Sequence, residues 1–180
     1  MGGLITVRFS LADGRQSDLA GLIVTGAALI IDEGVHPLVR RVGRLVARLA
    51  PDLPLIPPKP GVLSTDPAVE LAFLADPLTY KAPARAGLVD QMIRAGLDAR
   101  ARLDRLTLPL LVMHGTDDRL TSPAGSRFLR ERAASPDKTL VLWPGMRHEI
   151  FNEPDGAVVV TTVLDWLDAR FALDLTAGQG

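Results

Sequence analysis

The sequence has 180 residues, of which 47% are hydrophobic and 23% are charged, and its formal net charge is −1. This length and composition predict one globular domain with a hydrophobic core, and the charge gives no reason to expect nucleic acid as a partner. The absence of cysteine excludes disulfides, thiolate nucleophiles and cysteine-based zinc sites. No apolar run approaches the roughly 18 to 20 residues that a membrane-spanning helix needs.

The predicted elements alternate between helices and short apolar strands. The first helix covers residues 2–12 and ends at Asp13-Gly14, a helix stop signal. Helices are predicted again over residues 122–134, with Ser122 as N-cap, and over residues 155–171. The last helix is expected to bury Val158, Val159, Val163, Leu164 and Leu167. Apolar strands are predicted over residues 19–29, 108–113 and 138–143. This alternation predicts an α/β domain with a parallel sheet, followed by a disordered tail at 175–180.

Residues 33–106 break the alternation. They form a helix over 36–50, a proline-rich piece and a second helix that starts near Pro83. About 70 residues are too many for a plain connection, so they are expected to form a cap over the carboxyl edge of the sheet. The rest, residues 1–32 and 107–174, would be a partial core. The 36–50 helix has an apolar side and four arginines, Arg40, Arg41, Arg44 and Arg48. It is either a packed helix with a solvated polar face or a lid whose apolar side lies on an anionic or lipid surface.

An acid and a histidine follow neighbouring strands of this predicted sheet. Asp117 and Asp118 come after the second strand, and His148 lies in the loop after the third. A carboxylate at such a strand end can accept the Nδ1 proton of a histidine and fix its tautomer, which favours a catalytic pair. The alternative is that the aspartates cap the following helix and His148 is a surface residue. His114 is expected to pack beside the acid as a structural residue.

The sequence offers no strand-to-helix serine elbow of the form Gly-x-Ser-x-Gly. None of its six serines has glycine two residues before and two residues after it; they are Ser10, Ser17, Ser64, Ser122, Ser126 and Ser135. The three histidines show no metal-ligand spacing such as H-x-x-x-H, so no metal site is expected.

The motifs "HGTDDRL" and "GMRHE", placed after a cap, resemble the C-terminal half of the α/β-hydrolase-fold serine hydrolases. The resemblance is to monoacylglycerol lipases and lysophospholipases, in the group that also contains the S33-type peptidases. Their elbow commonly reads Gly-His-Ser-Met-Gly-Gly, and this chain begins Met1-Gly2-Gly3 and runs into a predicted helix. The resemblance therefore implies that the nucleophilic serine would be the residue just before Met1.

By the same resemblance, Asp118 is the triad acid, His148 is the general base, and the backbone nitrogen of Met1 belongs to the oxyanion hole. Glu149 and Glu153 match acids that follow the family's histidine and are expected to support the loop. Substrate contacts are implied for two further residues. Phe73 stands where the family has an aromatic near an Asp-Pro, but it lacks a hydroxyl for glycerol, and Leu120 would line the acyl pocket.

The resemblance implies ester hydrolysis by the intact protein, acting on a small lipid ester without a cofactor, and an inactive chain when these 180 residues stand alone. Two alternatives remain open: another α/β hydrolase, such as an epoxide hydrolase or dehalogenase, and a non-catalytic binding or dimerising half domain. Expected contacts are a membrane surface through the 36–50 helix, and the missing N-terminal half or a second copy along the open edge of the 19–29 strand. The expected location is cytoplasmic or peripheral to a membrane, with secretion left open.

Overall fold

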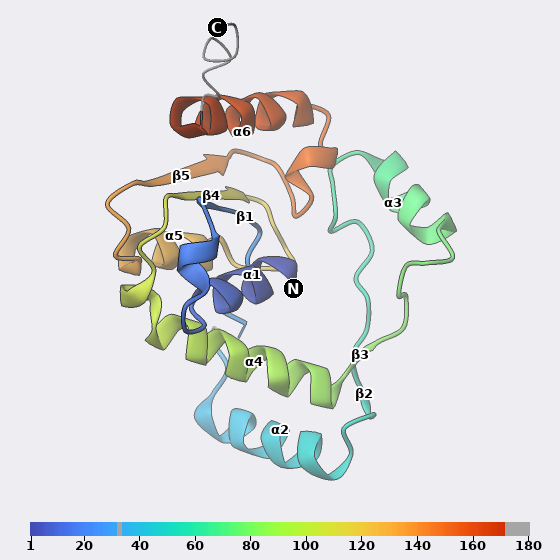
Figure 1. Ribbon diagram of the computed structural model, residues 1–180. Helices are drawn as coiled ribbons and strands as arrows, with labels where there is room; N and C mark the ends of the chain where they lie inside the picture. Colours follow the sequence, from blue (N-terminus) through green and yellow to red (C-terminus); the bar gives the residue numbers. More distant parts are fainter. Residues whose placement is uncertain (32–33, 172–180) are drawn as a thin grey trace, which may run out of the picture.

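The computed structural model describes residues 1–31 and 34–171, and its centre is a three-stranded parallel sheet (Figure 1). The strand order is β1-β4-β5, with bounds Leu22–Thr25, Leu110–Gly115 and Lys138–Trp143. The three predicted strands and their parallel arrangement are confirmed. The first strand is shorter than expected, because Gly26 has a φ of +52° and turns the chain out of the sheet.

Both faces of the central strand β4 are apolar and covered by helices. Leu110 and Val112 pack into one buried cluster with residues of α1, α4 and α5, whereas Leu111 and Met113 pack into a second cluster with residues of α6. Figure 1 shows α6 on one side of the sheet and the other three helices on the opposite side. The covering helices are α1 (Gly2–Ser10), α4 (Ala86–Ala101), α5 (Pro123–Arg132) and α6 (Gly156–Phe171). A parallel sheet between helical layers is the α/β architecture that the sequence predicts.

The helix boundaries follow the local sequence signals. The hydroxyl of Ser122 accepts a hydrogen bond from the Ala124 amide at 3.3 Å, and Pro123 occupies the first turn, so the predicted N-cap of α5 is confirmed. The described residues also contain three short 3₁₀ turns: η1 (Arg15–Asp18), η2 (Leu103–Arg105) and η3 (Ile150–Asn152).

The buried face of α6 differs from the expected one. Val159 is fully buried, and Val163 and Leu167 pack against the cluster beneath the helix, as predicted. Val158 and Leu164 are more than half exposed, so their predicted burial is wrong. The helix instead turns Trp166 into the core, because Val159, Val163 and Trp166 follow the i, i+4, i+7 spacing of a single helix face.

Between β1 and β4 the described residues form the two expected helices, the turn η2 and three further elements that were not expected. α4 and α2 (Pro37–Leu49) pack against each other, with α2 on the outer side of α4 (Figure 1). The end of α4 reaches the core, where Ala99 is fully buried. The unexpected elements are helix α3 (Pro67–Ala75) and a two-stranded antiparallel ribbon of β2 (Pro54–Ile56) and β3 (Ala84–Arg85).

The apolar side of α2 faces solvent. Five of its large apolar side chains are between 53% and 75% exposed: Leu38, Val39, Val42, Leu45 and Leu49. The helix instead places Ala47 against the rest of the molecule, and His36 caps its start by accepting the Leu38 amide. α2 therefore packs on α4 while its large apolar side chains stay exposed, and both alternatives for this helix stay predictions.

No helix among residues 1–31 and 34–171 is long and apolar enough to cross a bilayer. The tail predicted to be disordered, residues 175–180, lies outside the described residues.

Candidate active site

The sheet brings Asp118 and His148 together. β4 ends at Gly115 and β5 ends at Trp143, and because the two strands are parallel neighbours their loops leave from the same edge. Nδ1 of His148 lies 2.7 Å from Oδ2 of Asp118. The structure thus joins the two residues that the strand-end argument singled out, 30 positions apart in the chain.

The two loops are packed backbone to backbone around Gly115. A Cβ atom on this glycine would lie 2.2 Å from the carbonyl oxygens of both Met146 and Arg147, so no side chain fits there. The Asp117 amide donates to the Met146 carbonyl at 2.9 Å, and the Thr116 amide donates to a strand carbonyl of β5 at 2.9 Å. The histidine loop is therefore held against the acid loop independently of the side-chain pair.

The carboxylate of Asp118 is enclosed by donors on every side. Its Oδ1 accepts the amides of Leu120 and Thr121 at 2.8 and 3.0 Å. Its Oδ2 lies 2.7 Å from His148 Nδ1, 2.8 Å from the Thr121 hydroxyl and 2.9 Å from His114 Nε2, and the side chain has no exposed surface. Burial alone would raise its pKa, but the hydrogen bonds from His114, His148 and Thr121 outweigh it and hold the pKa of Asp118 well below its usual range. The acid is therefore ionised at neutral pH.

This ionised acceptor sets the tautomers of both histidines. Each must carry its proton on the nitrogen that faces Asp118, which is Nδ1 in His148 and Nε2 in His114. His114 is fully buried, and its Nδ1 then accepts from the Ser126 hydroxyl, 2.7 Å away on α5. In His148 the lone pair is left on Nε2, which makes no hydrogen bond within the described part of the chain. That nitrogen is the proton acceptor that general base catalysis needs.

Gly26, at the end of β1, packs directly against the pair. A Cβ atom there would lie 3.0 Å from His148 Cε1, 3.1 Å from its Nδ1 and 3.6 Å from Asp118 Oδ2. The positive φ of this residue also disfavours any side chain. Its carbonyl lies 3.1 Å from the Thr121 hydroxyl, so β1 contributes backbone to the same network.

The other residues singled out from the sequence occupy different places. Met1 is the N-cap residue of α1. Burial lowers the pKa of its amine, and the negative charge of Asp118 raises this pKa by a smaller amount. The side chain of Leu120 is 46% exposed, although its amide binds Asp118. Phe73 is half-buried on α3, and Asp117 is exposed. No three His, Asp or Glu side chains converge as a metal site within residues 1–31 and 34–171.

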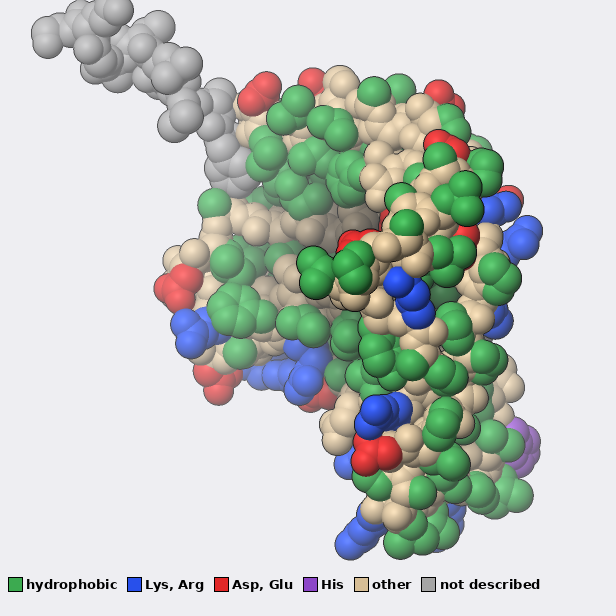
Figure 2. Space-filling model, turned by 90° about the vertical axis from the view of Figure 1, so that its right-hand side faces the viewer, with side chains coloured by type: hydrophobic (Ala, Val, Ile, Leu, Met, Phe, Trp, Pro, Cys, Tyr) green, Lys and Arg blue, Asp and Glu red, His purple; other side chains and the backbone are tan. Residues whose placement is uncertain are grey.

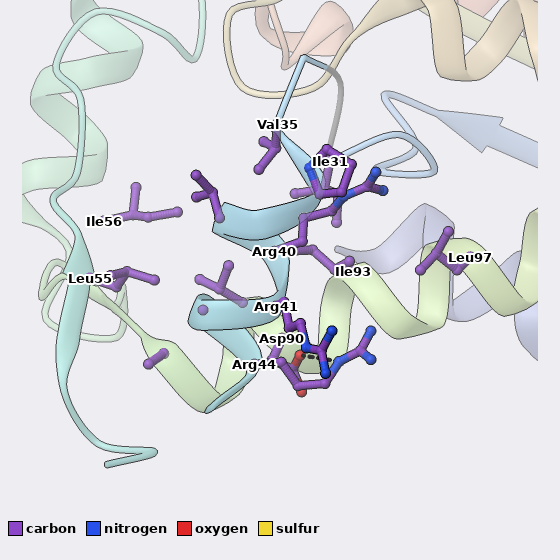
Figure 3. A pocket seen from close by; sticks show the side chains of 15 residues that line it. Ile31, Val35, Arg40, Arg41, Arg44, Leu55, Ile56, Asp90, Ile93 and Leu97 are labelled. Atoms are coloured by element: carbon purple, nitrogen blue, oxygen red, sulfur yellow. Dashed lines mark ion pairs between the residues drawn. The ribbon is translucent and has the colours of Figure 1, made fainter. Parts of the chain in front are cut away.

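A half-open, mainly apolar pocket of about 700 Å³ lies between α2, α4 and β2. Figure 3 shows Leu55 and Ile56 pointing from β2 toward α2, with Ile93 and Leu97 on the α4 side. Arg44 and Asp90, which also line this pocket, form an ion pair at 3.8 Å. Neither Phe73 nor Leu120 lines this pocket.

Sequence reasoning missed Gly26, Thr121 and Ser126 as parts of the site. Gly26 carried a signal, since a glycine directly after an apolar strand marks close backbone approach or a turn. Thr121 stands three residues after Asp118, the spacing at which a loop turns back on its own carboxylate. Ser126 carried no signal, because its role depends on how α5 packs on β4.

An acid and a histidine that follow adjacent strands of a helix-covered parallel sheet define the α/β-hydrolase class. Comparison with known proteins narrows this class. The sequence pattern of the serine aminopeptidase S33 family matches residues 1–155. The chain therefore belongs to this family of hydrolases.

Similar proteins are lipases and esterases. A monoacylglycerol lipase of Mycolicibacterium smegmatis is 36% identical over 167 residues, which cover 93% of this chain and 59% of that protein. A caffeoylshikimate esterase of Arabidopsis thaliana is 27% identical over 94% of this chain and 53% of its own length. The crystal structure of a Paleococcus ferrophilus monoacylglycerol lipase superposes with a TM-score of 0.81 at 26% identity, over 93% of this chain and 65% of the other. The chain spans between half and two thirds of the length of these proteins.

Proposed function

We propose that the protein containing this chain is a serine ester hydrolase that acts on monoacylglycerols or lysophospholipids. The observation that carries the proposal is the 2.7 Å contact of His148 Nδ1 with an ionised and fully enclosed Asp118. This arrangement leaves Nε2 of His148 as a base that can take a serine proton, while Asp118 stabilises the imidazolium.

We propose that the nucleophile is a serine that would precede Met1, as the family resemblance implies. The backbone nitrogen of Met1, at the start of α1, would then bind the oxyanion, because helix N-termini favour negative charge. Without a serine beside His148, these 180 residues alone would have no esterase activity; triad nucleophile loss costs on the order of 10⁶ in turnover.

The proposed action on lipids depends on a cap, for which we propose residues 33–106, with residues 1–32 and 107–174 as the core; residues 32–33 and 172–174 lie outside the part that the structure describes. The apolar pocket between α2, α4 and β2 is of a size that suits a small lipid. Leu120 and Phe73 are retained as acyl and head-group contacts of the assembled site, for which their positions outside this pocket give no direct support.

We also propose that α2 docks the protein on a membrane surface. Its exposed apolar side continues into Leu53, Leu55 and Ile56, each between 44% and 47% exposed. Figure 2 shows hydrophobic side chains gathered over the lower part of the molecule, where α2 lies in Figure 1, with Lys and Arg side chains among them. An apolar helix face flanked by arginines suits an interface with anionic lipids. We therefore propose a location at the periphery of a membrane.

The second partner proposal concerns β1. Its partner within the described sheet is β4 on one side, so its other edge is available to the N-terminal part of the protein or to a second copy.

Hydrolysis assays on the full-length protein test the proposed function. The substrates are monoacylglycerols, lysophospholipids and soluble esters of matched acyl length, each with wild-type protein, His148→Gln and Asp117→Asn. We expect release of fatty acid from at least one lipid ester, a loss of about 10⁴-fold or more in His148→Gln, and near wild-type rates in Asp117→Asn. Activity on an epoxide or haloalkane in place of all esters would contradict the proposal.

A further inference from the structure

The loop that carries His148 is fastened by a second buried acid. Glu153 is only 6% exposed. Its Oε1 accepts the Arg147 amide at 2.6 Å. Its Oε2 accepts the Ser64 hydroxyl at 3.1 Å and the Thr65 amide at 2.9 Å, and it also binds the Thr65 hydroxyl. One carboxylate therefore joins the histidine loop to a segment more than 80 residues earlier in the chain.

That segment, residues 62–65, is the part of the cap that reaches the active-site corner, and we call it the strap. Val62, Leu63 and Ser64 are buried, unlike the proline-rich stretch before them. In two further hydrogen bonds the histidine loop donates and the strap accepts. Arg147 Nη1 donates to the Ser64 carbonyl at 2.7 Å, and the Glu149 amide donates to the Leu63 carbonyl at 2.8 Å. The strap and the loop are thus bonded reciprocally.

These bonds fall on both chain neighbours of His148. The amide just before it, at Arg147, is bound by Glu153, and the amide just after it, at Glu149, is bound by the strap carbonyl of Leu63. Fixing the backbone on both sides of a residue limits the positions that its side chain can take. The strap bonds therefore restrict the backbone on both sides of His148, in addition to the contacts between its loop and the Asp118 loop.

The chemistry of the site requires a carboxylate rather than an amide. Burial alone would raise the pKa of Glu153. Hydrogen bonds from Thr65, Arg147 and Ser64 lower this pKa by more than burial raises it, so the carboxyl group is ionised. A glutamine has one acceptor oxygen, and its NH₂ group would meet either the Thr65 and Ser64 donors or the Arg147 amide. Such a substitution leaves buried donors unpaired with little change in volume.

We propose that Glu153 is a positioning residue that couples the cap to the general base: it holds the strap on the histidine loop and thereby orients His148 toward Asp118. The catalytic meaning of this coupling rests on the proposed function, whereas the coupling itself is measurable without any substrate.

The experiment compares Glu153→Gln with Glu149→Gln in the full chain. Glu149 is the matched control, because its carboxylate binds a single partner, Asn152, on the exposed side of the loop. The first readout is the downfield NMR resonance of the His148 Nδ1 proton, with the His114 Nε2 proton as an internal reference on the same carboxylate. The second is hydrogen exchange at the amides of Thr65, Arg147 and Glu149.

In Glu153→Gln we expect the His148 proton to broaden or shift while the His114 proton remains, and the three amides to exchange about tenfold faster or more. Glu149→Gln is expected to match wild type in both readouts. A His148 resonance and amide protection unchanged in Glu153→Gln would overturn the proposal.

A milder pair keeps the test decisive if Glu153→Gln does not fold. Thr65→Val removes one hydroxyl donor to Glu153, and Thr65→Ser restores it. We expect about threefold faster exchange at Arg147 in Thr65→Val and rescue in Thr65→Ser; identical behaviour of the two variants overturns the coupling. If the resonances respond as expected but the full-length protein cleaves no ester, the proposed function fails and the coupling stands.

Discussion

The surroundings of Asp118, which we call the corner, and the outer helix α2 differ in what their side chains contact. In the corner, one buried carboxylate receives donors from two histidines, a threonine and two amides, and glycines bring the backbone into close contact. On α2, large apolar side chains lie in solvent and the arginines line the same helix. The difference teaches that polar bonds within the molecule position the Asp118–His148 pair, whereas the exposed apolar side of α2 is the surface that we propose to contact a membrane.

The largest expected effect comes from removing the charge at the centre of the corner. Asp118→Asn presents an NH₂ group to a set of donors and no longer fixes the His148 tautomer, so turnover of the full-length protein should fall by about 10⁴-fold. Asp117→Asn is the control, because Asp117 is the exposed neighbour. Equal rates in the two variants, measured by fatty acid release, would remove Asp118 from the mechanism.

A smaller loss of activity is expected from a substitution that crowds the Asp118–His148 pair but leaves both side chains unchanged. Gly26→Ala places a methyl group 3.0 Å from the His148 ring, and a displacement of about 1 Å can cost about 10²-fold in rate. Gly14→Ala is the control, since Gly14 has a similar φ of +74° but open space around its Cβ position. Both variants should lose some stability in thermal unfolding, and an equal loss of activity in both would show that backbone strain alone is responsible.

The Ser126–His114 contact should matter less again. Ser126→Ala leaves the buried His114 Nδ1 without its donor, which is expected to cost about 1 to 3 kcal/mol of unfolding free energy and to lower activity by about tenfold. Ser10→Ala is the control, a buried serine that bonds within its own helix. Urea denaturation of the two variants makes the comparison, and a Ser126→Ala protein as stable as Ser10→Ala would mean that His114 is held by packing alone.

On the cap side, the expected effect is on membrane binding and not on chemistry. Leu45→Glu should weaken binding to anionic vesicles by about tenfold, because one exposed leucine contributes roughly 1.5 kcal/mol when buried. Leu78→Glu is the control, at a 92% exposed leucine outside α2. Hydrolysis of a soluble ester should be unchanged in both, and vesicle binding that falls equally in both variants would count against α2.

The smallest expected effect is a pH dependence of stability that arises from the buried acids Asp118 and Glu153. The pKa values of Asp118 and Glu153 lie lower in the folded than in the unfolded protein. Their stabilising contribution is therefore fully present above about pH 4 and is lost as the pH falls further toward the lowered values. Thermal unfolding between pH 6 and pH 3 should show a steeper loss in wild type than in Asp118→Asn, and parallel curves would contradict this assignment.

The sequence was sufficient for the sheet and for the central pair. An apolar strand followed by "HGTDD" and another followed by "GMRH" place Asp118 and His148 at one sheet edge, because parallel strands end together. It was not sufficient for Ser126 or for the strap bonds to Glu153, since these depend on packing between distant segments. The predicted buried face of α6 was partly wrong, because valines and leucines spread over a broad arc of this helix and periodicity alone does not select one face within it.

Labelling the full-length protein with a fluorophosphonate and mapping the modified residue by mass spectrometry tests most directly whether Asp118 and His148 serve a serine nucleophile. We expect one modified serine that is none of the six in these 180 residues, with labelling strongly slowed in His148→Gln and Asp118→Asn and unchanged in Asp117→Asn. Labelling of one of those six serines, or labelling that proceeds equally fast in His148→Gln, would contradict this expectation.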